Sequence, residues 1–178
     1  ENTNISLVQQ FIKQNEFRPG HIVIIDTPAG SSQRLWNLVA ESYCVLIPTT
    51  LSNADLLPTE TFIRSMDKVK ARYSKSLPHL IVCPNKVPFG QKDFSLIAER
   101  FNNHDVVIGP SIRDLASVRH FYNGKHEGRE RKTNLNAQND FDRFGKFITK
   151  FVLDGELDKI YSKNNTPKNI IPFEKTNN

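Results

Sequence analysis

HIVIIDTPAG, at residues 21–30, is the stretch that decides the fold. Its first part, at 21–26, centres on a continuous run of four β-branched apolar residues at 22–25, which is typical of a strand buried on both faces. The polar residues that follow predict a tight turn. Strands of this kind occur in parallel sheets that helices cover on both sides, so the stretch indicates an α/β protein.

The chain around this stretch alternates between apolar strands and amphipathic helices. Three further strands are predicted at 43–48, 80–85 and 105–109. The predicted helices lie at 4–16, 33–41, 53–74, 93–101, 112–122 and 140–153, with a polar loop at 125–139. The pattern predicts a mostly parallel sheet with helices on both faces, formed by one domain at 1–155 and followed by a polar tail at 156–178.

Apolar spacing sets the inward faces of two of these helices. The helix at 53–74 carries its apolar residues at intervals of three and four, as does the last helix. The expected core residues are Phe62, Met66, Val69 and Tyr73 in the former, and Phe141, Phe144, Ile148 and Phe151 in the latter.

Composition indicates a globular protein without a membrane span. The 178 residues are 38% hydrophobic and 24% charged, and no apolar run approaches the length of a transmembrane helix. The polar N-terminal residues lack the apolar core of a signal peptide, so we expect a cytoplasmic protein. Cys44 and Cys83 each lie in an apolar run, which favours small core residues over a redox pair or metal ligands.

The net charge of +5 is concentrated late in the chain. Residues 113–150 carry nine basic and five acidic side chains, centred on Arg129, Arg131 and Lys132. Such a cluster can neutralise the phosphates of a nucleic acid, but a charged segment is also commonly a solvated face. Charge alone leaves both interpretations open.

The residues that follow each predicted strand are the candidates for a site, because ligands bind at the carboxyl ends of parallel strands. Asp26 ends the first predicted strand, where a carboxylate can hold a water of a Mg²⁺ shell beside a phosphate. Gly30 then allows the backbone to turn toward a γ-phosphate. The alternative is that Asp26 only caps the turn, and the residue by itself does not decide between the two.

Four stretches, in order and at plausible spacing, resemble the ParA/MinD family of P-loop ATPases. VIIDTPAG resembles the family's segment of apolar residues followed by DxPxG, and LIPTTLSNADLLPTETF its next strand and long helix. LIVCPNK resembles the strand that ends in an adenine-facing Asn, and IGPSIRDLASVRHFYNGK the closing element. These matches cover residues 21 to about 125.

The resemblance implies part of a P-loop NTPase fold that binds ATP and Mg²⁺ and forms an ATP-dependent homodimer, acting in DNA partition or cargo positioning. Asp26 would be the catalytic residue and would hold Mg²⁺ through water. The implied nucleotide-binding residues are Thr27, Pro28, Gly30, Asn85 and Pro110. Pro88 stands where a guanine-reading NKxD motif has its Asp, so adenine is expected rather than guanine.

Partition members of the family bind DNA without sequence specificity through basic residues late in the chain. The implied DNA-binding residues here are Arg129, Arg131, Lys132, Lys146 and Lys150. A partition-type protein that stimulates hydrolysis is the other implied partner. The membrane-targeting helix of MinD-type members is less expected, because the helix at 140–153 is followed by a polar tail.

The chain departs from the family at the phosphate-binding loop. The KGGxGKT signature should precede the first strand, and residues 1–20 contain nothing similar. That loop supplies the backbone N–H groups that cradle phosphates. We therefore expect it upstream of residue 1; the alternative is a degenerate, non-catalytic ParA-like adaptor that binds DNA or a protein partner in partition or conjugation complexes.

Overall fold

A parallel three-stranded sheet forms the centre of the protein. The computed structural model describes residues 10–12, 14, 22–27, 33–73, 78–115 and 131–155. The strands are β1 (Cys44–Thr49), β2 (His79–Pro84) and β3 (Val106–Ile108), in the order β1-β2-β3. Cys44 lies beside His79, and Leu80 beside Val106. The parallel sheet and the α/β class predicted from the sequence are confirmed.

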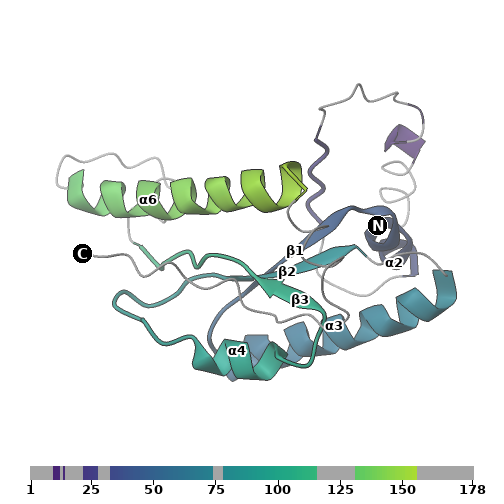
Figure 1. The fold of residues 1–178 in the computed structure, drawn as a ribbon, viewed down its shortest axis with the longest axis horizontal. Helices are drawn as coiled ribbons and strands as arrows, with labels where there is room; N and C mark the ends of the chain where they lie inside the picture. Colours follow the sequence, from purple (N-terminus) through teal and green to yellow (C-terminus); the bar gives the residue numbers. More distant parts are fainter. Residues whose placement is uncertain are drawn as a thin grey trace.

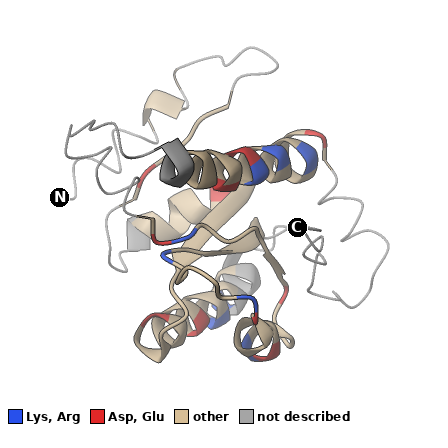
Figure 2. Ribbon diagram, turned by 90° about the vertical axis from the view of Figure 1, so that its left-hand side faces the viewer, with Lys and Arg blue, Asp and Glu red and all other residues tan. Residues whose placement is uncertain are grey.

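Helices cover both faces of this sheet (Figures 1 and 2). On one face lie α2 (Gln33–Glu41), α3 (Asn53–Tyr73) and α4 (Ser95–Phe101); on the other lies α6 (Arg131–Phe147), which continues as a π-helical segment, η1 (Ile148–Leu153). Side chains alternate along each strand, so β2 contributes Leu80 and Val82 to the first layer and Ile81 and Cys83 to the second. Helices on both faces, as predicted, are therefore present.

The larger layer contains three of the four side chains that the apolar spacing of α3 predicts, and the Tyr73 side chain lies outside those that the structure describes. Met66 and Val69 are buried, and Phe62 is half-buried with its ring stacked on that of Trp36. Phe101 of α4 is fully buried in the same cluster. None of the helices in the described ranges is long and apolar enough to cross a bilayer.

Residues 22–27 do not form the strand that their apolar run predicts. Ile22, Val23 and Ile24 are 61%, 43% and 90% exposed, and the segment lies outside the sheet (Figure 1). β-branched residues favour an extended backbone, but a strand also needs a neighbouring backbone to share its hydrogen bonds. No described residue pairs with this segment, so residues 22–26 of the predicted strand do not belong to the sheet.

Two element boundaries predicted late in the chain are also wrong. Residues 112–115, expected to begin a helix, are not helical, and Arg113 instead makes an isolated parallel bridge with Val87. Residues 131–139, expected in a loop, form the first turns of α6. Their polar composition does not oppose a helix that faces solvent.

Other predictions fall partly outside the described residues. Residues 10–12 and 14 are helical, in agreement with the helix predicted at 4–16, while the remainder of that helix lies outside the described ranges. Residues 116–122 of the helix predicted at 112–122 and the polar tail predicted at 156–178 also lie outside the described ranges.

The inward face of α6 is rotated from the predicted one. Phe147 is buried against the sheet and Phe144, Ile148 and Phe151 pack beside it, but Phe141 is 49% exposed. Asp140 takes its place, with 2% exposure. Helical spacing from Phe144 and Phe147 reaches both positions, and the ion pair described below selects Asp140.

Candidate functional site

A polar pocket of about 400 Å³ opens at the carboxyl ends of β1 and β2. Ligands of parallel sheets bind at this edge, outside the ends of the strands. The lining comes from the last residues of β1, the first turns of α3 and the two residues after β2: Pro48, Thr49, Thr50, Asp55, Pro58, Thr59, Asn85 and Lys86.

Hydrogen bonds between neighbouring elements fix the floor of this pocket. The Thr59 hydroxyl of α3 donates to the Thr49 hydroxyl of β1 at 3.1 Å, and both side chains are buried. The Thr49 carbonyl accepts the Asn85 N–H at 2.7 Å. Asp55 accepts the Thr50 hydroxyl, and its own N–H donates to Ser52 Oγ at 3.3 Å, which caps the start of α3.

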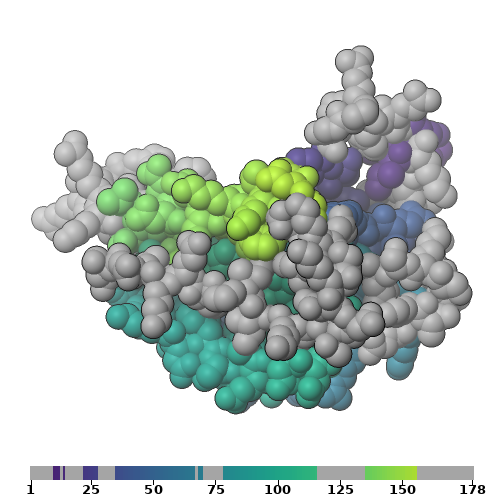
Figure 3. Space-filling model, in the orientation of Figure 1, coloured from purple at the N-terminus to yellow at the C-terminus, as the bar shows by residue number. Residues whose placement is uncertain are grey.

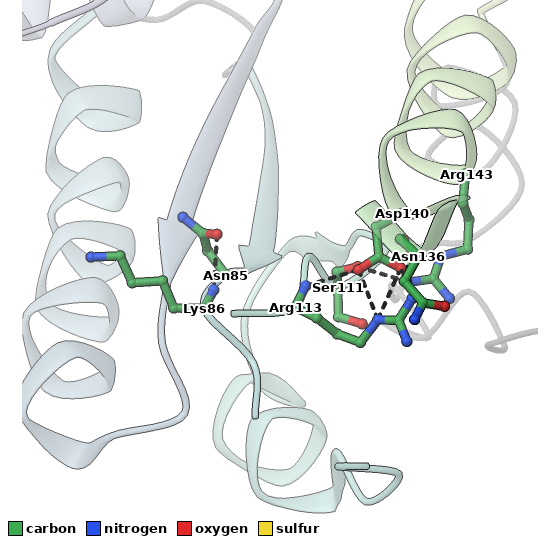
Figure 4. Close-up of polar contacts among 7 residues, drawn as sticks. All are labelled: Asn85, Lys86, Ser111, Arg113, Asn136, Asp140 and Arg143. Carbon is green, nitrogen blue, oxygen red and sulfur yellow. Dashed lines mark hydrogen bonds and ion pairs between the residues drawn. The ribbon is translucent and has the colours of Figure 1, made fainter. Parts of the chain in front are cut away.

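Asn85 and Lys86 form a tight turn directly after β2 (Figure 4). The Asn85 Oδ1 atom accepts the Lys86 N–H at 2.8 Å, and Lys86 has a φ of 50°. This left-handed conformation is uncommon for a residue other than glycine, so the surrounding contacts must hold it. The Asn85 amide nitrogen is left to donate, and the Lys86 side chain is exposed.

The next backbone contacts join this turn to the segment after β3. Val87 N–H donates to the Ile112 carbonyl at 3.1 Å, and the Val87 carbonyl accepts the Asp114 N–H at 2.8 Å. Ile112 N–H donates to the Pro84 carbonyl at 2.8 Å. The segments at 84–87 and 112–114 therefore run side by side beyond the sheet.

A second polar cluster joins the 111–113 segment to α6 (Figure 4). The Asp140 carboxylate accepts the Arg113 backbone N–H at 3.0 Å, and it accepts Nε and Nη2 of the same residue at 2.9 Å each. Arg113 Nη2 also donates to the Asn136 carbonyl at 3.1 Å, and Arg143 Nη2 to the Ser111 carbonyl at 2.8 Å. These five residues are called the Arg113–Asp140 cluster below.

Sequence reasoning missed this cluster and most of the pocket lining. Arg113 stands in the quoted stretch IGPSIRDL without a role, and Asp140 adjoins the predicted apolar stripe. An acidic residue at helical spacing from Phe144 and Phe147 is a signal that could have indicated a buried partner.

Two of the predicted nucleotide-binding residues follow neighbouring strands of the sheet. Asn85 follows β2, and Pro110 follows the residue after β3, where the Gly109 N–H donates to the Val82 carbonyl at 2.9 Å. Both therefore lie at the same edge of the sheet. Asp26 and Thr27 are exposed and belong to the segment outside the sheet, while Pro28 and Gly30 lie outside the described residues.

Four of the five predicted DNA-binding residues belong to α6 and η1, which reach the surface in Figure 3. Arg131 and Lys132 are the first two residues of α6, and Lys146 and Lys150 are exposed near its end and in η1. Lys150 Nζ lies 5.3 Å from the centroid of the Phe151 ring. Arg129 lies outside the described residues.

The described cysteines and acidic residues do not form a metal centre. No group of three or more His, Cys, Asp or Glu side chains that could hold a metal ion occurs within the described ranges. Burial raises the pKa of the Cys44 thiol to about 11, and burial together with the nearby Cys44 raises that of Cys83 to about 12. Both thiols stay protonated at neutral pH, as expected of core residues.

The side chains that line the pocket offer both hydrogen-bond donors and acceptors. Hydroxyl, amide, carboxylate and ammonium groups can donate and accept hydrogen bonds around a polar ring. A phosphate cradle of consecutive backbone N–H groups is not among the described residues that line the pocket. Comparison with protein-family models, with curated proteins and with solved structures found no match.

Proposed function

We propose that this chain is the C-terminal part of a ParA-type ATPase domain, an ATP-dependent dimerisation switch that acts in DNA partition or cargo positioning. The supporting observation is the pocket at the carboxyl ends of β1 and β2, which Asn85 and Lys86 line directly after a buried parallel strand. The order of residues that resembles the ParA/MinD family places its adenine-facing Asn at this same position.

Each residue has a defined part in this proposal. The Asn85 amide donates to the edge of adenine, and Pro110, on the adjacent segment, bounds the ring. Asp26 would hold Mg²⁺ through a water, and this role would require residues 22–27 to lie at the same edge of the sheet as Asn85. ATP and Mg²⁺ supply the phosphoryl-transfer chemistry when bound.

A non-catalytic adaptor of similar fold is the second candidate. The observation in its favour is the position of Asp26, which is exposed in a segment outside the sheet. The adaptor would bind DNA or a protein partner and would neither bind nor hydrolyse ATP. Isothermal titration with Mg-ATP of the protein that contains this chain, including any phosphate-binding loop, separates the two candidates.

We expect Asn85→Ala to weaken ATP binding by roughly 3- to 10-fold, the value of about one hydrogen bond to a ligand. Isothermal titration of the protein measures this change. Asn103→Ala, which removes an exposed amide between α4 and β3, is the matched control and should leave the affinity unchanged.

We further expect the 178 residues alone to bind ATP weakly or not at all. Equal affinities of Asn85→Ala and the parent would remove Asn85 from the site, and micromolar binding by the 178 residues alone would contradict the need for an added phosphate loop. No binding by any form would favour the adaptor.

A further inference from the structure

The Arg113–Asp140 cluster connects α6 to the pocket through a short series of direct contacts. Asp140, on the buried face of α6, holds both the backbone N–H and the guanidinium of Arg113. The Arg113 backbone is bridged to Val87, and Val87 follows Lys86, which lines the pocket. The buried Asp140 carboxylate is thus connected through Arg113 and Val87 to the turn that lines the pocket.

The charges in this cluster are arranged to fix one conformation. The Asp140 side chain is 3% exposed, while that of Arg113 is 25% exposed. A planar guanidinium and a carboxylate that share two hydrogen bonds have a single good geometry, unlike two packed apolar side chains. Arg143 Nη2 also lies 3.4 Å from the Asp140 carboxylate. Loss of the Arg113 side chain would leave this buried carboxylate with that single longer ion pair, which is unfavourable.

The ion pair also replaces an apolar contact that the helix could have made. Phe144 and Phe147 lie on the same side of α6, and Phe141, next to Asp140, points away from the core with 49% exposure. Well-packed apolar residues usually stabilise a core as well as a buried ion pair does. The presence of the ion pair is therefore not explained by a gain in stability alone.

Arg113 also reaches the outer part of the loop after β2. Its guanidinium carbon lies 5.7 Å from the centroid of the Phe89 ring. Together with the Val87 bridge, this contact attaches the loop at two points. The left-handed φ of Lys86, which an L-residue adopts only under constraint, lies just before the first of them.

We propose that Arg113 and Asp140 are a positioning pair, through which the seating of α6 sets the conformation of Asn85 and Lys86 and so the affinity of the pocket. The ligand in this inference is the nucleotide of the proposed function, and its affinity readout depends on that function. The coupling within the protein does not, so the two can be tested separately.

Asp140→Asn tests the coupling without a ligand. It removes the charge with little change of shape, and Asp142→Asn, at an exposed position on the same helix, is the matched control. Hydrogen exchange of the whole protein, followed by mass spectrometry, should show at least tenfold faster exchange in peptides that cover 84–90 and 109–115. Peptides of α3 and α4 should exchange as in the parent, and Asp142→Asn should change neither set.

Faster hydrogen exchange in all peptides of the Asp140→Asn variant would overturn the inference, and so would unchanged exchange in the peptides that cover 84–90. In the ligand arm, Asp140→Asn should weaken Mg-ATP binding at least fivefold, and Asp142→Asn should not. Unchanged ATP affinity beside local loosening would also overturn it. If the parent protein binds no ATP, the proposed function fails, and the exchange experiment alone then decides whether the pair positions the Asn85–Lys86 turn.

Discussion

Truncation of Phe147 to alanine is expected to lower the free energy of unfolding by about 3–5 kcal/mol. Phe147 is 6% exposed and packs against Ile81, Cys83 and Val107 on the sheet. Its ring centroid lies 4.8 Å from that of Phe151. Because it is buried against the sheet where α6 meets η1, its truncation would leave a cavity between the helix and the sheet.

The sheet below this ring is closely packed, which strengthens the expectation. A Cβ atom at Gly109 would lie 3.2 Å from Ile81 Cγ2 and 3.6 Å from Phe147 Cε1. A side chain larger than glycine at this position, directly after β3, would press on the side chains of Ile81 and Phe147, so the packing between the sheet and α6 leaves little free space. The cost of a cavity is largest where the surroundings collapse least.

Phe141→Ala is the matched control, because it deletes the same side chain six residues earlier on the same helix. Phe141 is 49% exposed, so its truncation should cost less than about 1 kcal/mol. Urea denaturation of both variants measures the difference. Thermal midpoints should differ in the same sense, with Phe147→Ala lowered by roughly 6–20 °C. Equal losses would mean that α6 is rotated so that Phe141 faces the sheet.

The elements that local sequence determines were predicted closely. The apolar runs at 43–48 and 80–85 became β1 and β2 with shifts of one residue, and α2 has the predicted bounds at 33–41. In these stretches local preference, apolar period and burial all favour the same structure. The same agreement explains why the large core layer around Met66 was predictable.

The elements that depend on distant partners were not. The run at 21–26 has the composition of a buried strand, but pairing requires a neighbouring backbone that no local pattern specifies. The first turns of α6 contain no apolar stripe, and Asp140 is buried only because Arg113, distant in sequence, meets it. Buried charge is selected by its partner, and the partner cannot be read from the helix alone.

The candidate site likewise contains some residues that the sequence predicts and others that it does not. Parallel topology was enough to predict that Asn85 and Pro110 lie at one edge, because both follow strands of one sheet. The contributions of Thr49, Asp55 and Lys86 depend on how α3 begins and on the left-handed turn after β2. Spacing does not show these, and a positive φ at a lysine has no sequence signature.

Reversing the charges of Arg129, Arg131 and Lys132 is expected to flatten the salt dependence of DNA binding by roughly two to three log–log units. Each phosphate that a basic side chain neutralises releases counterions, with a slope of about −0.9 per contact. Lys146 of α6 and Lys150 of η1, both exposed and four residues apart, are two further positive charges. Their joint reversal to Glu should flatten the slope by about two units.

Matched charge reversal elsewhere distinguishes contact from general attraction. Lys68 of α3 and Lys92 of the loop before α4 are exposed, and their reversal to Glu changes the net charge of the protein by the same amount as reversal of Lys146 and Lys150. If DNA is attracted only by the overall charge of the protein, the two double variants should bind with the same salt dependence. If α6 and η1 form a DNA-binding face, only reversal of Lys146 and Lys150 should flatten the salt dependence. Fluorescence anisotropy on random duplex DNA, across a salt series and with ATP present so that the proposed dimer forms, measures both. Equal slopes in all variants, or binding that survives high salt, would mean that these side chains form a solvated face, and the adaptor with a protein partner would then be favoured.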